Sequence, residues 1–173
     1  RRARGVLLVM HQMGSHGPAY YKRSPAAMKS FQPECNSHAL QNCPPEHIVN
    51  AYDNSILYTD HFIAKTVKWL QAQSRPTALI YVSDHGESLG EKGLYLHGMP
   101  YSLAPKEQIH VPMLVWLSKP LQRERNWRMD CLQAQSAKAL SHDHLFHSVL
   151  GLMGVGTEVY RRELDAYAAC ASR

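Results

Sequence analysis

Four residues in this chain have the types and positions expected of a metal site, and two of them are adjacent. Asp84 and His85 follow the apolar run 78–82 and precede Gly86, where a sharp turn would let both side chains converge on one cation. His16 and His97 lie in two other glycine-containing segments. Carboxylate and neutral imidazole groups suit Zn²⁺, a Lewis acid that can stabilise a deprotonated nucleophile and the charge on a phosphoryl oxygen. The residues therefore predict a zinc site suited to phosphate chemistry.

Each of these residues also has a simpler interpretation. An Asp-His pair is common in loops, so His85 could be only a hydrogen-bonded loop residue. His16 and His97 could do no more than order their own loops. The Cys35 and Cys43 pair lacks the two-to-four-residue spacing of structural zinc sites, so the cysteines offer no competing zinc motif.

The predicted metal residues depend on strands that end at one edge of a sheet. The apolar runs 6–10, 78–82 and 111–117 are predicted strands, and apolar residues at intervals of three and four predict a helix from Glu46 to about Gln73. Strand, helix and strand in this order form a βαβ crossover, which places the loops after 6–10 and 78–82 on the same side. The expected fold class is α/β, with a mainly parallel sheet flanked by helices.

The segments outside this unit are less regular. Prolines between residues 20 and 45 interrupt any long helix. We expect Ser141 and Asp143 to cap a helix from Leu145 to Met153, and residues 118–130 to be exposed. Residues 158–173 are expected to form a helical or frayed tail.

Composition narrows the class of protein. The chain has 173 residues, 45% of them hydrophobic and 19% charged, which is typical of a folded domain. No apolar run approaches the about 20 residues of a membrane-spanning helix. The net charge of +5 comes from scattered basic residues, which favours a basic surface or attraction to an anionic membrane over nucleic-acid binding.

The four cysteines give information on the cellular compartment of the protein. Cys35 and Cys43 lie in a polar, proline-rich loop, where a disulfide is favoured because free cysteines prefer burial. A disulfide there implies an oxidising compartment such as the periplasm. Cys131 and Cys170 could pair with each other or stay free.

Several ordered motifs resemble the lipid A phosphoethanolamine transferases, the family of the mobile colistin-resistance enzymes within the alkaline phosphatase and sulfatase superfamily. The segments that carry the resemblance are 10–23, 50–56, 81–91, 95–100, 104–108 and the strand at 111–112. The resemblance covers residues 5–118 and continues more loosely through 141–155. It implies that residues 1–173 are the C-terminal part of an alkaline phosphatase-like catalytic domain.

The resemblance also implies an activity and a location. Family members transfer phosphoethanolamine from phosphatidylethanolamine, through a threonine, to a phosphate of lipid A, which confers polymyxin resistance. They do so with zinc on the periplasmic face of the bacterial inner membrane, tethered by N-terminal helices. By this resemblance, Asp84 and His85 are zinc ligands. His16 and His97 lie near a second metal or the substrate phosphate, and Cys35 and Cys43 form a family disulfide.

The chain departs from the family pattern in one respect. The nucleophilic threonine and a glutamate zinc ligand belong to a preceding half of the domain, and no threonine here has the expected surroundings. We therefore expect the chain to be inactive alone. Two alternatives stay open: another superfamily enzyme, such as a sulfatase or phosphoglycerol transferase, and a non-catalytic zinc-binding module.

Overall fold

A computed structural model describes residues 5–171, which form two compact units. The larger unit comprises residues 11–72 and 79–116. The smaller unit comprises residues 5–10, 73–78 and 117–171. All four predicted metal residues belong to the larger unit.

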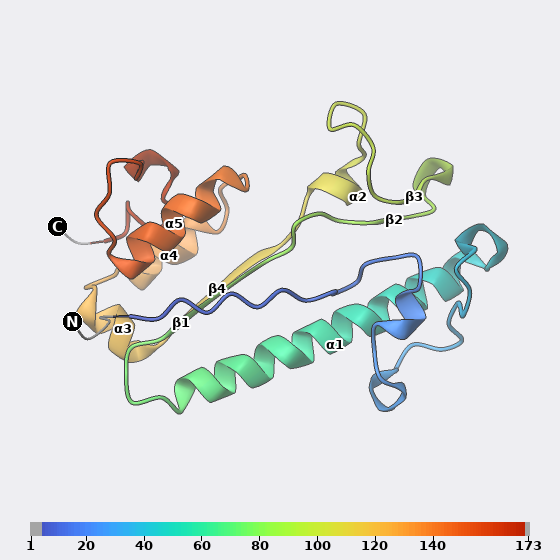
Figure 1. The fold of residues 1–173 in the computed structure, drawn as a ribbon, viewed down its shortest axis with the longest axis horizontal. Coiled ribbons are helices and arrows are strands. Elements are labelled where there is room, and N and C mark those ends of the chain that lie inside the picture. Colours follow the sequence, from blue (N-terminus) through green and yellow to red (C-terminus); the bar gives the residue numbers. More distant parts are fainter. Residues whose placement is uncertain (1–4, 172–173) are drawn as a thin grey trace. The chain divides into compact units, whose positions relative to one another are not determined.

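The described residues form helices and short strands along the whole chain (Figure 1). The α-helices are α1 (Pro45–Gln71), α2 (Lys106–Ile109), α3 (Lys119–Glu124), α4 (Met129–Gln135) and α5 (Asp143–Met153). The strands are β1 (Ala78–Val82), β2 (Ser88–Leu89), β3 (Tyr95–Leu96) and β4 (Met113–Leu117). Short 3₁₀ helices are η1 (Tyr20–Lys22), η2 (Ala26–Met28), η3 (Leu40–Asn42), η4 (Glu91–Gly93) and η5 (Arg162–Leu164). None of the described helices is long and apolar enough to cross a membrane.

Helix α1 has the bounds that its sequence predicts. It begins with Pro45, whose missing N–H is no loss in the first turn, and it carries Glu46 near its N-terminus and Lys68 near its C-terminus, as the helix dipole favours. Its buried face includes Ile48 and Ala51, which are completely inaccessible to solvent. The expected helix from Glu46 to about Gln73 is confirmed.

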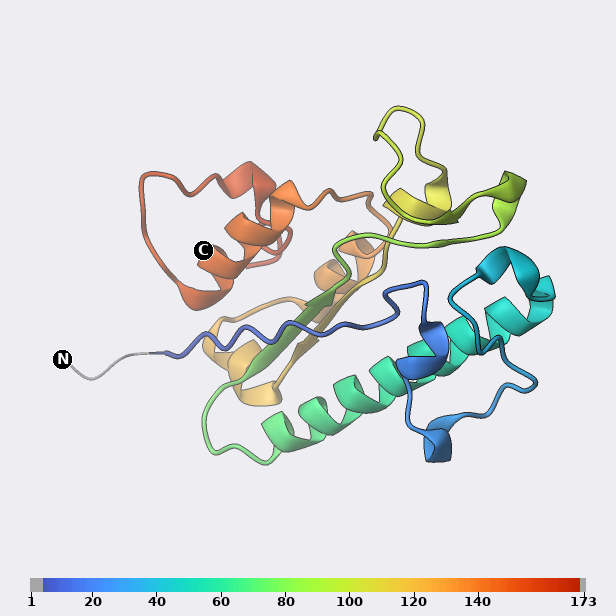
Figure 2. The same ribbon diagram turned by 45° about the vertical axis from the view of Figure 1, so that its right-hand side comes forward.

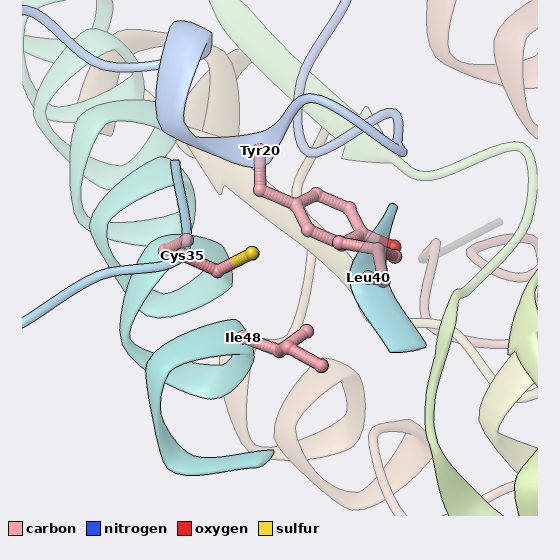
Figure 3. Close-up of a cluster of buried hydrophobic side chains, with 5 residues drawn as sticks. Tyr20, Cys35, Leu40 and Ile48 are labelled. Atoms are coloured by element: carbon pink, nitrogen blue, oxygen red, sulfur yellow. The ribbon is translucent and has the colours of Figure 1, made fainter. Parts of the chain in front are cut away.

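The irregular segment before α1 packs onto that face. Tyr20, Cys35 and Leu40 join Ile48 and Ala51 in one cluster of buried side chains (Figure 3). The structure joins Cys35 to Cys43 by a disulfide, which closes a loop of sequence separation 8. Residues 20–42 have three short 3₁₀ helices as their regular elements and otherwise form loops. The core of the larger unit thus lies between the long helix α1 and this irregular segment.

The strands form two two-stranded sheets. β1 and β4 lie side by side (Figures 1 and 2). The backbone N–H of Ser118, just after β4, donates to the carbonyl of Thr77, just before β1. At the other end, the N–H of Gly86, after β1, donates to the carbonyl of Gln108, before β4. The start of β1 therefore lies beside the end of β4, and the two strands are antiparallel. β2 and β3 are also antiparallel, with Ser88 opposite Leu96. The mainly parallel sheet that the sequence suggests is therefore not what the described strands form.

The predicted first strand at 6–10 differs most from the structure. Residues Val6, Leu7, Leu8, Val9 and Met10 have no regular secondary structure, and their exposed fractions range from 48% to 80%. Apolar, β-branched residues favour an extended chain, but a strand also needs a hydrogen-bonding neighbour. The predicted βαβ crossover is therefore wrong for the described residues.

The smaller unit is held by its own disulfide. Cys131 and Cys170 are bonded, closing a sequence separation of 39. Ser118 caps α3 by accepting from the Leu121 N–H, and α5 ends at Gly154 with a left-handed φ of 65°. Buried residues of the last segment include Tyr167 and Cys170, so the expected helical or frayed tail is instead a packed, mostly non-helical segment.

Candidate metal centre

Three of the predicted site residues converge in the larger unit. His16, His85 and His97 each offer a ring nitrogen, and these three atoms lie within 4.8 Å of one another. The rings of His85 and His97 are stacked with centroids 3.7 Å apart, and the His16 ring lies 5.2 Å from His97. These residues come from loops before η1, after β1 and after β3. The fold therefore brings together His16 and His97, which are 81 positions apart in the sequence.

Hydrogen bonds select which nitrogen of two imidazoles is available. The His85 Nδ1 lies 3.0 Å from the Gly86 carbonyl oxygen, which can only accept, so Nδ1 is the donor and the lone pair of the neutral ring is on Nε2. The His97 Nδ1 lies 3.0 Å from Glu87 Oε1, and donation to this carboxylate leaves the His97 Nε2 free in the same way. In the neutral form of each ring, Nε2 is therefore the nitrogen that a metal can bind.

Asp84 lies beside this cluster and is far more exposed. Its Oδ2 is 3.9 Å from the His85 Nε2, and 79% of its side chain is open to solvent. Two ligand atoms of one tetrahedral zinc lie about 3.3–3.5 Å apart, given bonds of about 2.0–2.2 Å. A small rotation of an exposed carboxylate closes that difference. The donor types therefore fit zinc, while the separations of 3.9 Å between Asp84 and His85 and up to 4.8 Å among the three imidazoles are wider than those of a bound ion.

Glu87 is the site residue whose position the sequence did not predict. Its side chain is 3% exposed, and its oxygens accept from the Gly17 N–H at 3.3 Å, the Tyr20 hydroxyl at 3.0 Å and His97. The His16 Nδ1 lies 3.9 Å from the same carboxylate. The position of Glu87 after Gly86 in the sequence does not reveal these contacts. The actual partners come from two other loops.

The surroundings of Glu87 also perturb a tyrosine. Burial, followed by the negative charge and hydrogen bond of Glu87, raises the pKa of Tyr20 well above its usual range. Tyr20 is therefore a neutral donor across the physiological range. Since Tyr20 is also part of the buried cluster, Glu87 connects the hydrophobic core to the histidines.

Gly86 serves a different purpose from the turn that the sequence suggests. Its φ is not in the left-handed region, but its N–H donates to the Gln108 carbonyl at 2.9 Å, and a Cβ on this residue would collide with the Glu107 backbone oxygen. Glycine is required here by the close approach of two backbones. This contact positions the Asp84–His85 loop against the segment before β4.

The described threonines of α1 show none of the features of a nucleophile. Thr66 donates its hydroxyl to the Phe62 carbonyl at 2.9 Å, and Thr59 is 8% exposed. The histidines, by contrast, keep 31–44% of their side chains exposed. The three histidines are therefore accessible to a bound ion or molecule, whereas the threonines of α1 offer no exposed nucleophile.

Comparison with known proteins identifies the family. Residues 2–155 match the sulfatase family model. Over 167 residues, or 95% of the chain, the sequence is 46% identical to the phosphoethanolamine transferase EptA of Salmonella typhimurium. The chain spans only 30% of that protein's length.

Two solved structures are also similar. One is the soluble domain of the lipooligosaccharide phosphoethanolamine transferase A from Neisseria meningitidis, with a TM-score of 0.91 and 43% identity over 94% of this chain and 50% of that chain. The other is the C-terminal periplasmic domain of phosphoethanolamine transferase EptC from Campylobacter jejuni, with a TM-score of 0.83 and 44% identity over 91% of this chain and 50% of that one. These matches confirm the expected alkaline phosphatase-like α/β fold class and the expected resemblance, while the described strands of this part of the domain pair antiparallel. The chain belongs to the sulfatase family, and within it corresponds to part of the catalytic region of the phosphoethanolamine transferases.

Proposed function

We propose that this chain forms the histidine-rich part of the active site of a zinc-dependent enzyme that transfers phosphoethanolamine from phosphatidylethanolamine to a phosphate of lipid A. The observation that carries the proposal is the convergence of the His16, His85 and His97 nitrogens within 4.8 Å at a partly exposed surface. The similarity to named phosphoethanolamine transferases supplies the reaction.

Asp84 and His85 would hold the zinc ion, and His16 and His97 would lie beside it or beside the substrate phosphate. When bound, zinc supplies Lewis-acid stabilisation of negative charge on a phosphoryl oxygen. The protein's own contribution is orientation: hydrogen bonds from the Nδ1 atoms of His85 and His97 to Gly86 and Glu87 would hold the rings with Nε2 available to an ion. A histidine with a free Nε2 can also accept a proton from an attacking group or return it to a leaving group.

A basic cavity near His16 suits the phosphates of an anionic acceptor. It has a volume of about 370 Å³ and is lined in part by Lys22, Arg23 and Tyr58. Arg23 Nε donates to the His16 carbonyl at 2.7 Å, which ties this cavity to the histidine loop. Guanidinium and ammonium groups are the side chains that best recognise phosphate.

The proposed location is the periplasmic face of the bacterial inner membrane. Two disulfides among the described residues favour an oxidising compartment. Phosphoethanolamine transfer turns a phosphate monoester of lipid A into a diester that carries an ammonium group, so the net negative charge falls and cationic polymyxins are attracted less. Such an enzyme would confer polymyxin resistance.

Zinc binding by the 173-residue chain is the first test. We expect His85→Ala to lower zinc affinity by about 10–100-fold or more, whereas His61→Ala, on α1, is the matched control and leaves it unchanged. Equal zinc binding by both variants would exclude this centre.

Activity requires a second experiment. A chimaera in which this chain replaces the matching region of the Salmonella typhimurium transferase is assayed for transfer from labelled phosphatidylethanolamine to lipid A. We expect turnover in the chimaera, its loss in the His85→Ala version, and none with the chain alone. A folded, zinc-loaded chimaera without turnover would refute the proposed reaction.

A further inference from the structure

An uncharged loop beside the site histidines exposes apolar side chains to solvent. This loop, residues 98–105, connects His97 to α2 within the larger unit, and we call it the tyrosine loop. Its residues Met99, Tyr101 and Leu103 are 37%, 81% and 68% exposed. Scattered exposed apolar side chains are normal, whereas a contiguous exposed group marks an interaction surface. In Figures 1 and 2 the tyrosine loop projects beyond α2, on the side away from α1.

The backbone of the tyrosine loop has few polar groups that need water. Its two prolines have no N–H. The N–H groups of Leu103 and Ala104 both donate to the Pro100 carbonyl, at 2.8 and 2.9 Å. The Met99 N–H donates to the Gln108 Oε1 at 3.4 Å. Because unpaired backbone groups are costly away from water, these features lower the cost of moving the loop into a less polar phase.

A buried glutamine connects the tyrosine loop to the segment that carries His85. Gln108 is 4% exposed, and besides accepting from Met99 its side chain donates through Nε2 to the Ser88 hydroxyl at 3.0 Å. The Gln108 carbonyl accepts from the N–H of Gly86, the residue after His85, at 2.9 Å. A surface that holds the tyrosine loop is therefore held next to the histidines as well.

The side chains in and beside the loop match the interface of a lipid bilayer. The loop has no charged side chain whose dehydration would oppose insertion. Tyr101 combines an apolar ring with a hydroxyl, the combination that is enriched at the level of lipid headgroups. Lys106, directly after the loop, is 83% exposed, whereas the side chain of Glu107 is 28% exposed. An apolar tip beside an exposed cation fits an acyl boundary covered by anionic headgroups.

We propose that the tyrosine loop inserts into the interface of a phospholipid bilayer and so holds the histidine site at the membrane surface. Tyr101 and Leu103 enter the region between headgroups and acyl chains, and Lys106 contacts anionic lipid. This inference goes beyond the proposed function, because docking depends on these side chains and needs neither zinc nor turnover. If the proposed function also holds, the same contact brings the headgroup of the donor lipid close to His97.

Vesicle binding by the 173-residue chain tests the proposal, with a zinc chelator present so that the metal centre has no part in the outcome. The chain is sedimented with vesicles of phosphatidylethanolamine and phosphatidylglycerol. We expect Tyr101→Ser combined with Leu103→Ser to weaken binding at least about tenfold. Val155→Ser combined with Val159→Ser is the matched control, because these loop residues are 46% and 59% exposed, and it leaves binding unchanged. Lys106→Gln weakens binding about fivefold, an effect that high salt removes.

A fluorescent label shows whether the loop itself enters lipid. The two disulfides use all four cysteines, so Ser102→Cys provides the one free thiol for a polarity-sensitive label. We expect its emission to shift to shorter wavelength when vesicles are added, whereas the same label on Thr157→Cys, an exposed position after α5, shows no shift. The replaced side chains are exposed, so each variant should keep the circular dichroism spectrum of the parent chain. Absence of vesicle binding, equal losses in the two double variants, or an unshifted label at position 102 overturns the proposal.

Discussion

Replacing Glu87 tests whether a single buried carboxylate holds the three histidine loops together. Its Oε1 accepts from Gly17 and His97, and its Oε2 accepts from Tyr20. Glu87→Ala removes all three acceptors. Glu87→Gln keeps an oxygen for Gly17 and His97, and the Tyr20 hydroxyl can rotate to accept from the new amide. The two variants therefore separate loss of hydrogen bonds from loss of charge.

The expected magnitudes follow from burial. Gly17 and Tyr20 are buried, so each donor left unpaired by Glu87→Ala costs about 1–3 kcal/mol, for a total of about 2–6 kcal/mol. His97 is 32% exposed and can bond to water instead, so it is left out of this sum. Glu87→Gln exchanges partners without orphaning a donor and costs about 1 kcal/mol.

The assay is urea unfolding of the metal-free chain, followed by a zinc titration of each variant. Glu124→Gln, an exposed residue of α3, is the control. We expect Glu87→Gln to keep most of the stability but to bind zinc about 10–100-fold more weakly, because the carboxylate orients the His97 ring. If Glu87→Ala unfolds at the same urea concentration as Glu124→Gln, the reasoning about shared acceptors is refuted. Full zinc affinity in Glu87→Gln would show that His97 needs no carboxylate partner.

Other regions of the chain make independent predictions. Breaking the Cys131–Cys170 disulfide by double alanine substitution should lower the unfolding free energy by about 4 kcal/mol, whereas breaking Cys35–Cys43 should lower it by about 2.5 kcal/mol. The difference arises because the two disulfides close loops of sequence separation 39 and 8, and the longer loop loses more entropy in the unfolded chain. Equal losses in urea unfolding would contradict this. Asn54 is fully buried and bonds to Ser30, Phe31 and Glu34, so Asn54→Asp should cost about 2–5 kcal/mol by placing two carboxylates together. Asn50→Asp is its control: it removes only a solvent-exposed hydrogen bond to the Pro33 carbonyl and should cost about 1 kcal/mol. Burial and the hydrogen bond to Asp165 raise the pKa of Tyr160 from 10.0 to about 12. The Tyr160 hydroxyl keeps its proton to a higher pH in the folded state than in the unfolded state, so its contribution to the unfolding free energy is complete below about pH 10 and lost by about pH 12. Ultraviolet titration should show tyrosinate formation at high pH that Tyr160→Phe removes in part.

Local signals in the sequence were sufficient for the elements that depend on neighbouring residues. The helix at Pro45–Gln71 has its own starting proline and its own apolar periodicity, and the run Ala78–Val82 is apolar throughout. The segment Val6–Met10 has the same composition as a strand but is exposed. Strand formation requires a partner, and composition does not identify one. The packed segment around Tyr167 could not be predicted for the same reason, because its burial depends on a disulfide and on α5.

The histidines show a similar division between local and long-range information. An acid and an imidazole after an apolar strand led to the prediction of a metal site, which stays a prediction, and Asp84 lies 3.9 Å from His85. The residue types alone do not show which contacts orient the imidazole rings. Gly86 provides a carbonyl one residue from His85, while Glu87 reaches His97 and the loop of Gly17, which is 70 positions away in the sequence. These hydrogen bonds favour the Nδ1–H tautomers of His85 and His97, in which Nε2 is the nitrogen available to a metal.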